Sequence, residues 1–474
     1  MDHLIFDKWA SLPGKAETVL LSAPFTFPPA PSIALSVFKS CLTEAGISSI
    51  VLYPVFPLIH ALGMESASEL SDFAPAKCVN EFLFAHLTDV NNEFDEQNFV
   101  EEVFREGSEE WRGQFAKRLA GYRRKAAQCV EMTARRVISM GAKVVAASSI
   151  YSQQNASLAV FRRVKELDPG IKTIIGGFNV SGDMGACVLR NYPSVDYVFF
   201  GDGDEVFAEV VRAAEAGGPM PYGILGREDL SDTSGELPFR LTKEMDTVPM
   251  PDYSDFFDEI ARERDCFYGE CLLSASPDKE ETSSPDKEGS APPDREETSS
   301  PDKEGSAPPD KEENAPPDKE EWKGRFPHGF ERIIFLEGSR GCSWGQKRAC
   351  SFCSINGLRN VYREKTPAVL YEEINRILDR WPGANIQLSD NMLGPAMRRE
   401  LLPMLKADGR SRSMFAEVLS TLKEEDLRAL GQAGLFRVQP GTESLNDHLL
   451  QQPLFAEKPF TSGKERMESF RRIC

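Results

Sequence analysis

An eight-residue unit that begins at Pro277 repeats six times in succession and divides the chain into two parts. Each unit opens with PDKE or PDRE, and almost no side chain in it is apolar. Such a segment cannot bury enough apolar surface to offset the conformational entropy lost on folding, and solenoid repeats are longer and richer in apolar residues. We therefore expect residues 276–324 to form an extended, disordered linker. We interpret it as a spacer, with binding through its acidic charge as the weaker alternative.

Charge and hydropathy exclude several classes of partner. The repeat accounts for nine of the nineteen net negative charges, so the rest of the chain is only mildly acidic. Nonspecific binding to nucleic acid needs clustered Lys and Arg, so we expect no nucleic-acid partner. No apolar run approaches the ~20 residues of a membrane span, and the start of the chain lacks the basic and apolar regions of a signal peptide. We expect a cytoplasmic protein that contacts no membrane and whose ten cysteines are thiols or metal ligands.

Residues 1–230 have the pattern of a doubly wound α/β domain. Short apolar runs alternate with helical segments, which is typical of a parallel sheet covered by helices on both faces. The expected strands are 18–24, 48–56, 143–149, 172–177 and 195–203. The expected helices are 32–46, 98–140, 156–167, 184–191 and 205–214. Ligands of such sheets bind at the carboxyl ends of the strands.

Small residues gather at those carboxyl ends. They are Ser148, Ser149, Gly176, Gly177, Gly201 and Gly203. Glycine allows a ligand to approach the backbone closely, but it is equally common in ordinary tight turns. The sequence has no GxGxxG or phosphate-loop motif here, so the residues alone leave both a cofactor crevice and plain loops open.

The α/β pattern resumes after the linker. A connecting segment at 231–275 precedes the linker, and residues 325–450 follow it. The expected strands of this second part are 331–342, 385–392, 413–420 and 435–444, and the expected helices are 367–381, 400–409 and 423–434. Strands alternating with helices in series predict a partial (β/α) barrel, whose functional groups lie at the carboxyl ends of the strands. The residues at those ends are the cysteine loop, Asp390, Asn391, Glu417 and Glu443.

Three cysteines, Cys342, Cys350 and Cys353, form the strongest chemical signal. They lie on a glycine-rich loop directly after the first expected strand of the second part. Thiolates are soft metal ligands, and an iron–sulfur cluster held by three of them keeps one iron open for another ligand. A structural zinc site is normally closed by four ligands, which would require a histidine such as His328. We favour the iron–sulfur site, with a zinc site and unliganded thiols as alternatives.

Polar residues at the neighbouring strand ends are candidates to orient a ligand on that open iron. Asp390 and Asn391 follow one strand, and Glu417 and Ser420 lie at the end of the next. These side chains can bind an amine or a ribose hydroxyl. Each one alone is equally well explained as a solvated position or a helix N-cap. Their shared position at one edge of the sheet favours binding.

The cysteine loop resembles that of one enzyme family. It has the form RGCxWGxKxxCxFC over residues 340–353, with seven residues between the first two cysteines. Most radical S-adenosylmethionine (SAM) enzymes have CxxxCxxC, whereas the longer form is similar to cobalamin-dependent radical SAM enzymes that mature ribosomally made peptides, often C-methyltransferases. The resemblance extends over most of the chain outside the repeat and the tail. Similar stretches are 31–39, 152–166, 176–179, 184–185, 200–205 and 249–257.

The resemblance implies cofactors and partners. Residues Cys342, Cys350 and Cys353 would hold a [4Fe–4S] cluster whose open iron binds SAM. The SAM contacts would be Phe352, Asp390, Asn391, Glu417 and Ser420. Cobalamin would lie on a B12-binding, Rossmann-like sheet, with the corrin over Ser149, Gly176, Gly177, Gly201 and Gly203. The chain has no DxHxxG motif, so no histidine ligand to cobalt is implied. The substrate would be a precursor peptide, and the electrons would come from a donor such as a flavodoxin or ferredoxin.

Two features depart from the family pattern. Residues 451–474 lose the apolar periodicity where a complete barrel would continue through two more βα units, so we expect a divergent tail and a C-terminally truncated barrel. Leu419 and Thr421 also stand where the family leads us to expect Lys and Asn. These departures leave two alternatives to a peptide methyltransferase. One is a catalytically inactive remnant that retains cobalamin or peptide binding, and the other is a radical enzyme that transfers no methyl group.

Overall fold

The computed structural model describes two α/β parts of the chain. The described residues are 2–26, 29–90, 95–231, 237–262, 333–347, 353, 361–420, 422–444 and 446–450. The linker expected at 276–324 and the tail expected at 451–474 lie outside them. None of the described helices combines the length and the apolar character that a bilayer crossing requires.

The first part is built on a six-stranded sheet in the order β2-β1-β3-β4-β5-β6. The strands are β1 (Thr18–Leu21), β2 (Ser49–Leu52), β3 (Val144–Ser148), β4 (Lys172–Gly176), β5 (Tyr197–Phe199) and β6 (Ile224–Gly226). All neighbouring pairs are parallel except β5 and β6, which are antiparallel. Because β2 lies on one side of β1 and the later strands lie on the other, the sheet is doubly wound. The predicted α/β fold class is confirmed.

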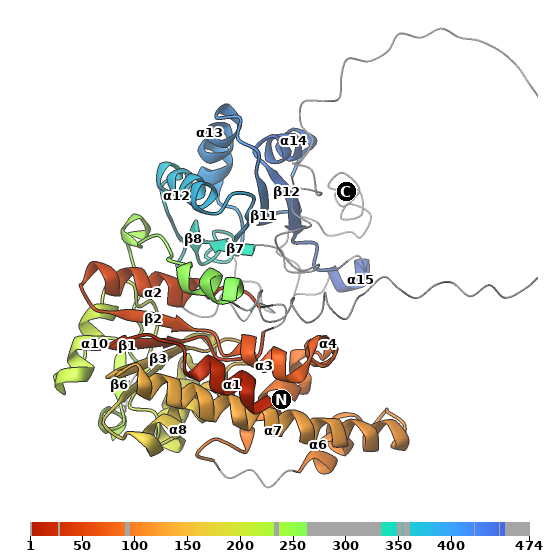
Figure 1. The fold of residues 1–474 in the computed structure, drawn as a ribbon. Coiled ribbons are helices and arrows are strands. Elements are labelled where there is room, and N and C mark those ends of the chain that lie inside the picture. The colour runs from red at the N-terminus through yellow and green to blue at the C-terminus, as the bar shows by residue number, and fades with distance from the viewer. Residues whose placement is uncertain are drawn as a thin grey trace, which may run out of the picture.

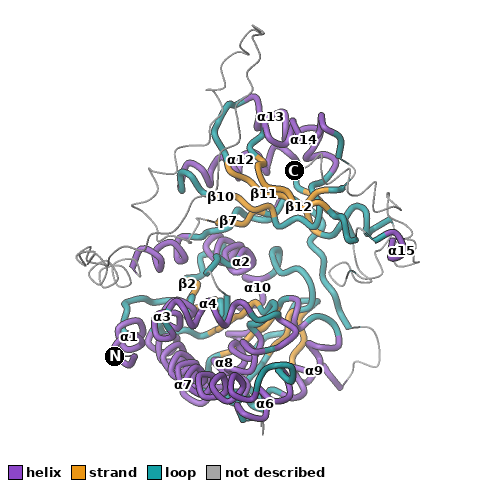
Figure 2. The backbone as a smooth tube through the Cα atoms, turned by 90° about the vertical axis from the view of Figure 1, so that its right-hand side faces the viewer, coloured by secondary structure: helices purple, strands orange, loops and turns teal. Residues whose placement is uncertain are grey.

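Helices cover both faces of this sheet. Helices α2 (Ile33–Glu44) and α10 (Phe207–Ala216) pack together on the face nearer the second part, and α7 (Glu109–Ser139) and α8 (Gln154–Leu167) pack together on the other (Figures 1 and 2). Further helices of this part are α1 (Asp2–Ala10), α3 (Val55–Leu62), α4 (Met64–Asp72), α5 (Val79–Ala85), α6 (Glu96–Val103) and α9 (Asp183–Asn191). Short 3₁₀ turns are η1 (Pro75–Lys77), η2 (Phe178–Val180), η3 (Glu228–Ser231) and η4 (Met245–Thr247).

Local chemistry explains two differences from the expected elements. The strand expected at 48–56 ends at Leu52, because the apolar run after it forms α3, with Pro57 in the first turn where a proline is tolerated. The helix expected at 98–140 is two helices. The second of them, α7, begins after Ser108, whose hydroxyl caps the helix by accepting a 3.2 Å hydrogen bond from the Trp111 amide.

The second part is a four-stranded parallel sheet in the order β12-β11-β10-β7. Its strands are β7 (Ile333–Leu336), β10 (Asn385–Leu388), β11 (Ser413–Val418) and β12 (Leu435–Pro440). Burial alternates along β7, β10 and β11, and the buried face packs against helices that follow the strands. These helices are α12 (Pro367–Arg380), the π-helical turn η5 (Met397–Leu401), α13 (Leu402–Ala407) and α14 (Glu424–Gln432). The described residues of this part also include a short ribbon of β8 (Ser339–Arg340) and β9 (Arg363–Glu364) and the helix α15 (Asp447–Leu450).

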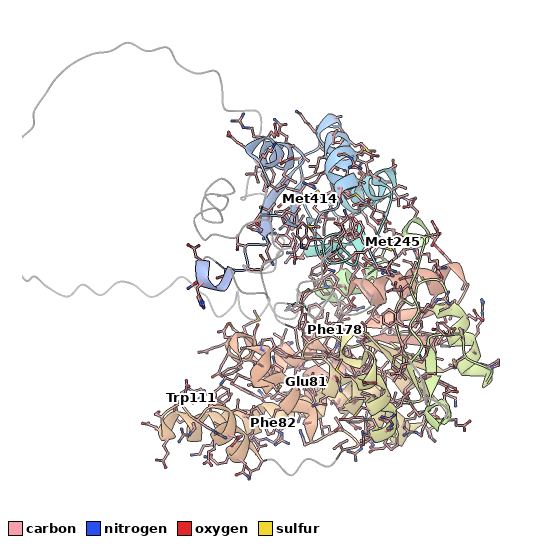
Figure 3. The ribbon with its side chains drawn as sticks, turned by 180° about the vertical axis from the view of Figure 1, so that it is seen from behind. Glu81, Phe82, Trp111, Phe178, Met245 and Met414 are labelled. Carbon is pink, nitrogen blue, oxygen red and sulfur yellow. The ribbon has the colours of Figure 1, made fainter. Side chains whose placement is uncertain are left out.

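The segment after η4 joins the two parts. Met245 and Val248 pack against Val37 and Cys41 of α2, and Met245 lies where the two parts meet (Figure 3). Phe256 belongs to the core of the first part. Tyr253 belongs to the core of the second, where its hydroxyl donates a 2.5 Å hydrogen bond to the carbonyl of Phe335 in β7. The segment expected to act as a connector therefore contributes side chains to both cores.

Candidate cofactor site

A cavity of about 290 Å³ lies at the carboxyl ends of β3, β4 and β5. Four of the predicted glycines line it: Gly176, Gly177, Gly201 and Gly203. Ser148 lines it as well, whereas Ser149 does not. The cavity thus lies at the sheet edge where doubly wound folds bind ligands.

Ser149 and Gly177 are explained by close backbone packing beside the cavity. Ser149 is fully buried, and its amide donates a 2.8 Å hydrogen bond to the carbonyl of Gly176. Its hydroxyl accepts from the side-chain amide of Asn179 at 3.0 Å. Gly177 has a φ of 100°, and a Cβ there would lie 2.5 Å from the Ser149 carbonyl oxygen. Only glycine fits this turn without displacing the backbone at the end of β3.

Most of the cavity wall is apolar. It includes Ile33 and Val37 near the start of α2 and two stacked rings, Phe38 and Phe207, whose centroids are 4.1 Å apart. Gly203 lies against the Phe38 ring, since a Cβ there would come within 2.8 Å of its Cζ. An apolar wall with a few polar groups at one side is typical of a site for an organic ligand.

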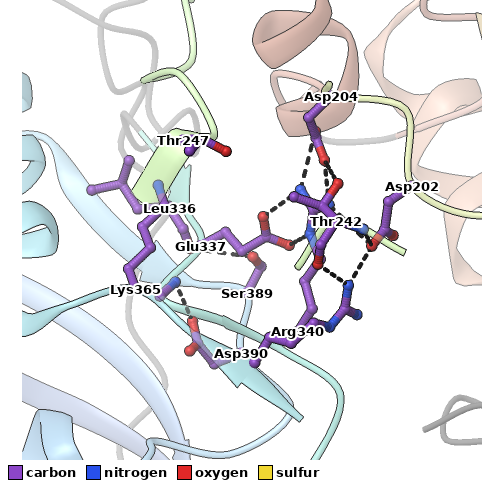
Figure 4. A network of polar contacts seen from close by, with 12 residues as sticks. Asp202, Asp204, Thr242, Thr247, Leu336, Glu337, Arg340, Lys365, Ser389 and Asp390 are labelled. Carbon is purple, nitrogen blue, oxygen red and sulfur yellow. Dashed lines mark hydrogen bonds and ion pairs between the residues drawn. The ribbon is translucent and has the colours of Figure 1, made fainter. Parts of the chain in front are cut away.

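The polar side of the cavity is an ion-pair network between the two parts of the chain (Figure 4). The Arg340 guanidinium donates two 2.8 Å hydrogen bonds to the Glu337 carboxylate, and two more to Asp204, of which Nη2–Oδ1 measures 3.1 Å. Arg363 donates to Asp202 (2.5 Å) and to the carbonyl of Thr242 (2.6 Å). The two arginines therefore tie the start of the cysteine region to the loop after β5.

Charge keeps Asp204 ionised in this buried network. Burial by itself would raise the pKa of its carboxyl, but the hydrogen bonds and positive charge of Arg340 outweigh burial and hold the pKa below its usual value. The Thr242 hydroxyl adds a 3.0 Å hydrogen bond to the same carboxylate. Asp204 thus remains an anionic partner for Arg340 throughout the neutral range.

The cysteine loop starts beside this network. Cys342 is 9% exposed, and its Sγ accepts a 3.3 Å hydrogen bond from the Gly345 amide. Cys353 is half-buried, whereas Cys350 and Phe352 lie outside the described residues. No group of three metal-binding side chains gathers within the described ranges, and the predicted set includes the undescribed Cys350. The three-cysteine cluster site stays a prediction.

Asp390 and Asn391 point toward the start of the cysteine loop. Asp390 is 2% exposed, and its carboxylate accepts hydrogen bonds from the Gly338 amide (2.9 Å) and the Ser339 hydroxyl (2.5 Å). Burial raises the pKa of this carboxyl to about 7. The Asn391 side chain donates to the Gly341 carbonyl at 3.3 Å. Asp390 and Asn391, two of the residues predicted to contact SAM, therefore hold the backbone that leads to Cys342.

The next strand end is organised differently. Glu417 is half-buried on β11, where burial raises the pKa of its carboxyl, and its backbone carbonyl accepts a 2.7 Å hydrogen bond from Leu393. Ser420 is buried at 4% exposure. Glu443 follows β12 with a φ of 52°. The end of β11 therefore contacts the chain that follows Asn391 through the Glu417 backbone.

Three carboxylates of the polar network lie at strand ends that the sequence marks as candidates for ligand binding. Glu337 follows the apolar run of β7, and Asp202 and Asp204 follow that of β5. The expectation that ligand-binding groups lie at strand ends applies to these carboxylates as it does to the glycines. Their pairing with Arg340 depends on how the two parts pack, which no local pattern encodes.

Comparisons with known proteins find similar solved structures. No protein-family model and no curated protein matches the chain. Among solved structures, the fold is similar to the radical S-adenosylmethionine methyltransferase TsrM from Kitasatospora setae with cobalamin and a [4Fe–4S] cluster bound (TM-score 0.49, 12% identity, 97% of this chain and 66% of that chain). The same enzyme with tryptophan substrate and a SAM analogue gives a TM-score of 0.48 at 13% identity, over 96% of this chain and 65% of that one. The chain spans less than two thirds of that enzyme's length.

Proposed function

We propose that this chain is a radical SAM enzyme that binds a [4Fe–4S] cluster, SAM and cobalamin and methylates a carbon of a ribosomally made precursor peptide. The observation that supports it most is the contact between two sites. The loop that starts at Cys342 follows β7 of one parallel sheet, and Arg340, two residues before that loop, lines the cavity at the strand ends of the other sheet. When bound, the cluster supplies the electron that cleaves SAM, and cobalamin carries the methyl group.

The residues around the cavity fit part of a cobalamin molecule. An apolar wall suits a corrin or its side groups, and the glycine-lined strand ends allow close approach to the backbone. A cavity of about 290 Å³ is smaller than the whole cofactor, so the remainder would lie over the same edge. Exposed apolar side chains border that edge, namely Tyr151, Phe178 and Met184.

The cluster loop has the donors that an iron–sulfur cluster requires. Cys342, Cys350 and Cys353 would supply three thiolates. We assign SAM contacts to Phe352, Asn391, Glu417 and Ser420, and we assign Asp390 the role of holding the loop, since both of its carboxylate oxygens accept hydrogen bonds from Gly338 and Ser339. The precursor peptide would approach from the same strand ends, and a flavodoxin or ferredoxin would supply electrons.

Turnover tests this proposal. The anaerobically reconstituted chain, given SAM with a labelled methyl group, hydroxocobalamin, a chemical reductant and candidate precursor peptides, is expected to form 5′-deoxyadenosine and a labelled peptide. Formation of 5′-deoxyadenosine without peptide label would favour radical chemistry that transfers no methyl group. Corrinoid binding with no SAM cleavage would contradict the proposal and favour the inactive remnant.

A further inference from the structure

Arg340 lies between the cysteine loop and the cavity of the first sheet. It stands two residues before Cys342 on β8, and it lines the cavity at the strand ends of the first sheet. Its partner Asp204 lies 136 residues earlier in the chain, in the loop after β5. A single side chain thus contacts the loop proposed to hold the cluster and the cavity proposed to hold cobalamin (Figure 4).

We propose that Arg340 is a positioning residue that fixes the cysteine loop against the cavity and thereby sets the separation between the cluster and cobalamin. This inference rests on the proposed function. Its basis is the four directed hydrogen bonds from one guanidinium to two carboxylates, one on each part of the chain. A planar guanidinium binds both carboxylates in fixed orientations, which a lysine ammonium cannot do.

The acceptors of Arg340 are themselves held in place. Asp204 accepts from the Thr242 hydroxyl at 3.0 Å, and Asp202 accepts from the Thr242 amide at 3.0 Å and from Arg363. Arg340 also lies 3.4 Å from the Asp202 carboxylate. The network therefore includes two arginines of the second part. Loss of Arg340 would remove hydrogen bonds both from Glu337 in the second part and from Asp204 in the first.

Burial distinguishes this link from another ion pair between the two parts. The side chains of Arg340 and Asp204 are 16% and 6% exposed. Arg380 on α12 pairs with Asp252 at a longer 3.8 Å, with 53% and 29% exposure. Exposed pairs contribute little, whereas loss of one partner of a buried pair leaves an uncompensated charge. Arg380→Gln is therefore a matched control that removes an arginine from the same contact between the parts.

Amide hydrogen exchange in the full chain without cofactors tests the link directly. Arg340→Gln and Asp204→Asn are each expected to accelerate exchange over residues 338–347 by roughly tenfold to a hundredfold. The double variant is expected to exchange no faster than the faster single variant, because each substitution already breaks the Arg340–Asp204 ion pair. Arg340→Lys is expected to fall between the wild type and Arg340→Gln, and Arg380→Gln to match the wild type. Equal exchange in wild type and Arg340→Gln would overturn the inference.

Magnetic resonance of the loaded chain tests the spacing. With the reduced cluster and cob(II)alamin both bound, the wild type is expected to show a magnetic coupling between the two paramagnets. Arg340→Gln and Asp204→Asn are expected to bind both cofactors in wild-type amounts with a weaker or broadened coupling, while Arg380→Gln retains it. Unchanged coupling in Arg340→Gln would contradict the positioning role of Arg340 and leave the proposed function standing. A wild-type chain that binds neither cofactor would instead contradict the proposed function.

Discussion

The carboxylate of Asp390 at the end of β10 accepts a 2.5 Å hydrogen bond from the hydroxyl of Ser339, which stands three residues before Cys342. The second Asp390 oxygen accepts from the Gly338 amide at 2.9 Å. The carbonyl of Gly338 in turn accepts from the Lys365 amide at 2.8 Å. The entrance to the cysteine loop is therefore fixed from two neighbouring elements.

Burial of Asp390 predicts a pH dependence of folding. Its pKa is raised from 3.8 to about 7, so between these values the folded chain keeps a proton that the unfolded chain releases. The contribution of this group to stability is thus complete below about pH 4 and is lost as the pH rises through 7, by an amount on the order of a few kcal/mol.

Urea unfolding of the chain without cofactors tests this pH dependence. Between pH 5 and pH 8, the free energy of unfolding of Asp390→Asn is expected to fall by less than that of the wild type. Asp379→Asn, at a 68% exposed carboxylate, serves as the control. The same pH dependence in wild type and Asp390→Asn would contradict this role of burial.

The buried pair Lys365–Glu373 predicts a non-additive effect on stability. Its side chains are 2% and 6% exposed, and the Lys365 ammonium lies 2.6 and 2.7 Å from the two Glu373 oxygens. Removal of one partner is expected to cost about 3–5 kcal/mol, because the other charge stays buried alone. Urea unfolding is expected to show a large loss in Lys365→Met and Glu373→Met and a smaller loss in the double variant. A double-variant loss equal to the sum of the single losses would show that the two charges are not coupled.

The contact of Gly203 with Phe38 predicts an effect on corrinoid binding. A methyl group at Gly203 would lie 2.8 Å from Phe38 Cζ and would displace the ring, which stacks on Phe207 in the cavity wall. Gly203→Ala is expected to weaken hydroxocobalamin binding by about tenfold or more, as overpacking typically costs 1–3 kcal/mol. Absorption titration measures this affinity. Gly113→Ala, in α7 with open space around its Cβ position, is expected to bind as the wild type does. Equal affinity in the Gly203 variant would place the corrinoid elsewhere.

The first sheet was largely predictable because its strands carry strong local signals. The run that ends in Gly176 and Gly177 is apolar, short and followed by glycine, which favours a buried strand with a tight turn. The strand expected at 48–56 was extended past Leu52 because a continuous apolar run has no periodicity that distinguishes a strand from a buried helix. The antiparallel edge strand β6 is only three residues long and gives no comparable signal.

The candidate site was predictable only in part. Four of the glycines at the predicted strand ends line one cavity, because parallel strands bring their carboxyl ends to one edge. Their role in cofactor binding stays a prediction. The same argument placed Asp390 beside the cysteine loop but assigned its carboxylate to a ligand, whereas the structure directs it to Gly338 and Ser339. Whether a side chain faces a ligand or the backbone of a neighbouring loop depends on tertiary packing. The pairing of Arg340 with Asp204 depends entirely on how the two parts of the chain pack together.

Assembly of the cluster tests the central claim most directly. Iron and sulfide analysis with EPR spectroscopy of the reduced, anaerobically reconstituted chain is expected to show one [4Fe–4S] cluster per chain, with a signal that changes when SAM binds the open iron. Cys350→Ala is expected to abolish the cluster, whereas Cys187→Ala, at an exposed cysteine outside the loop, is expected to retain it in full. A wild-type chain that assembles no such cluster, or a Cys350→Ala variant that still assembles it, would contradict the account.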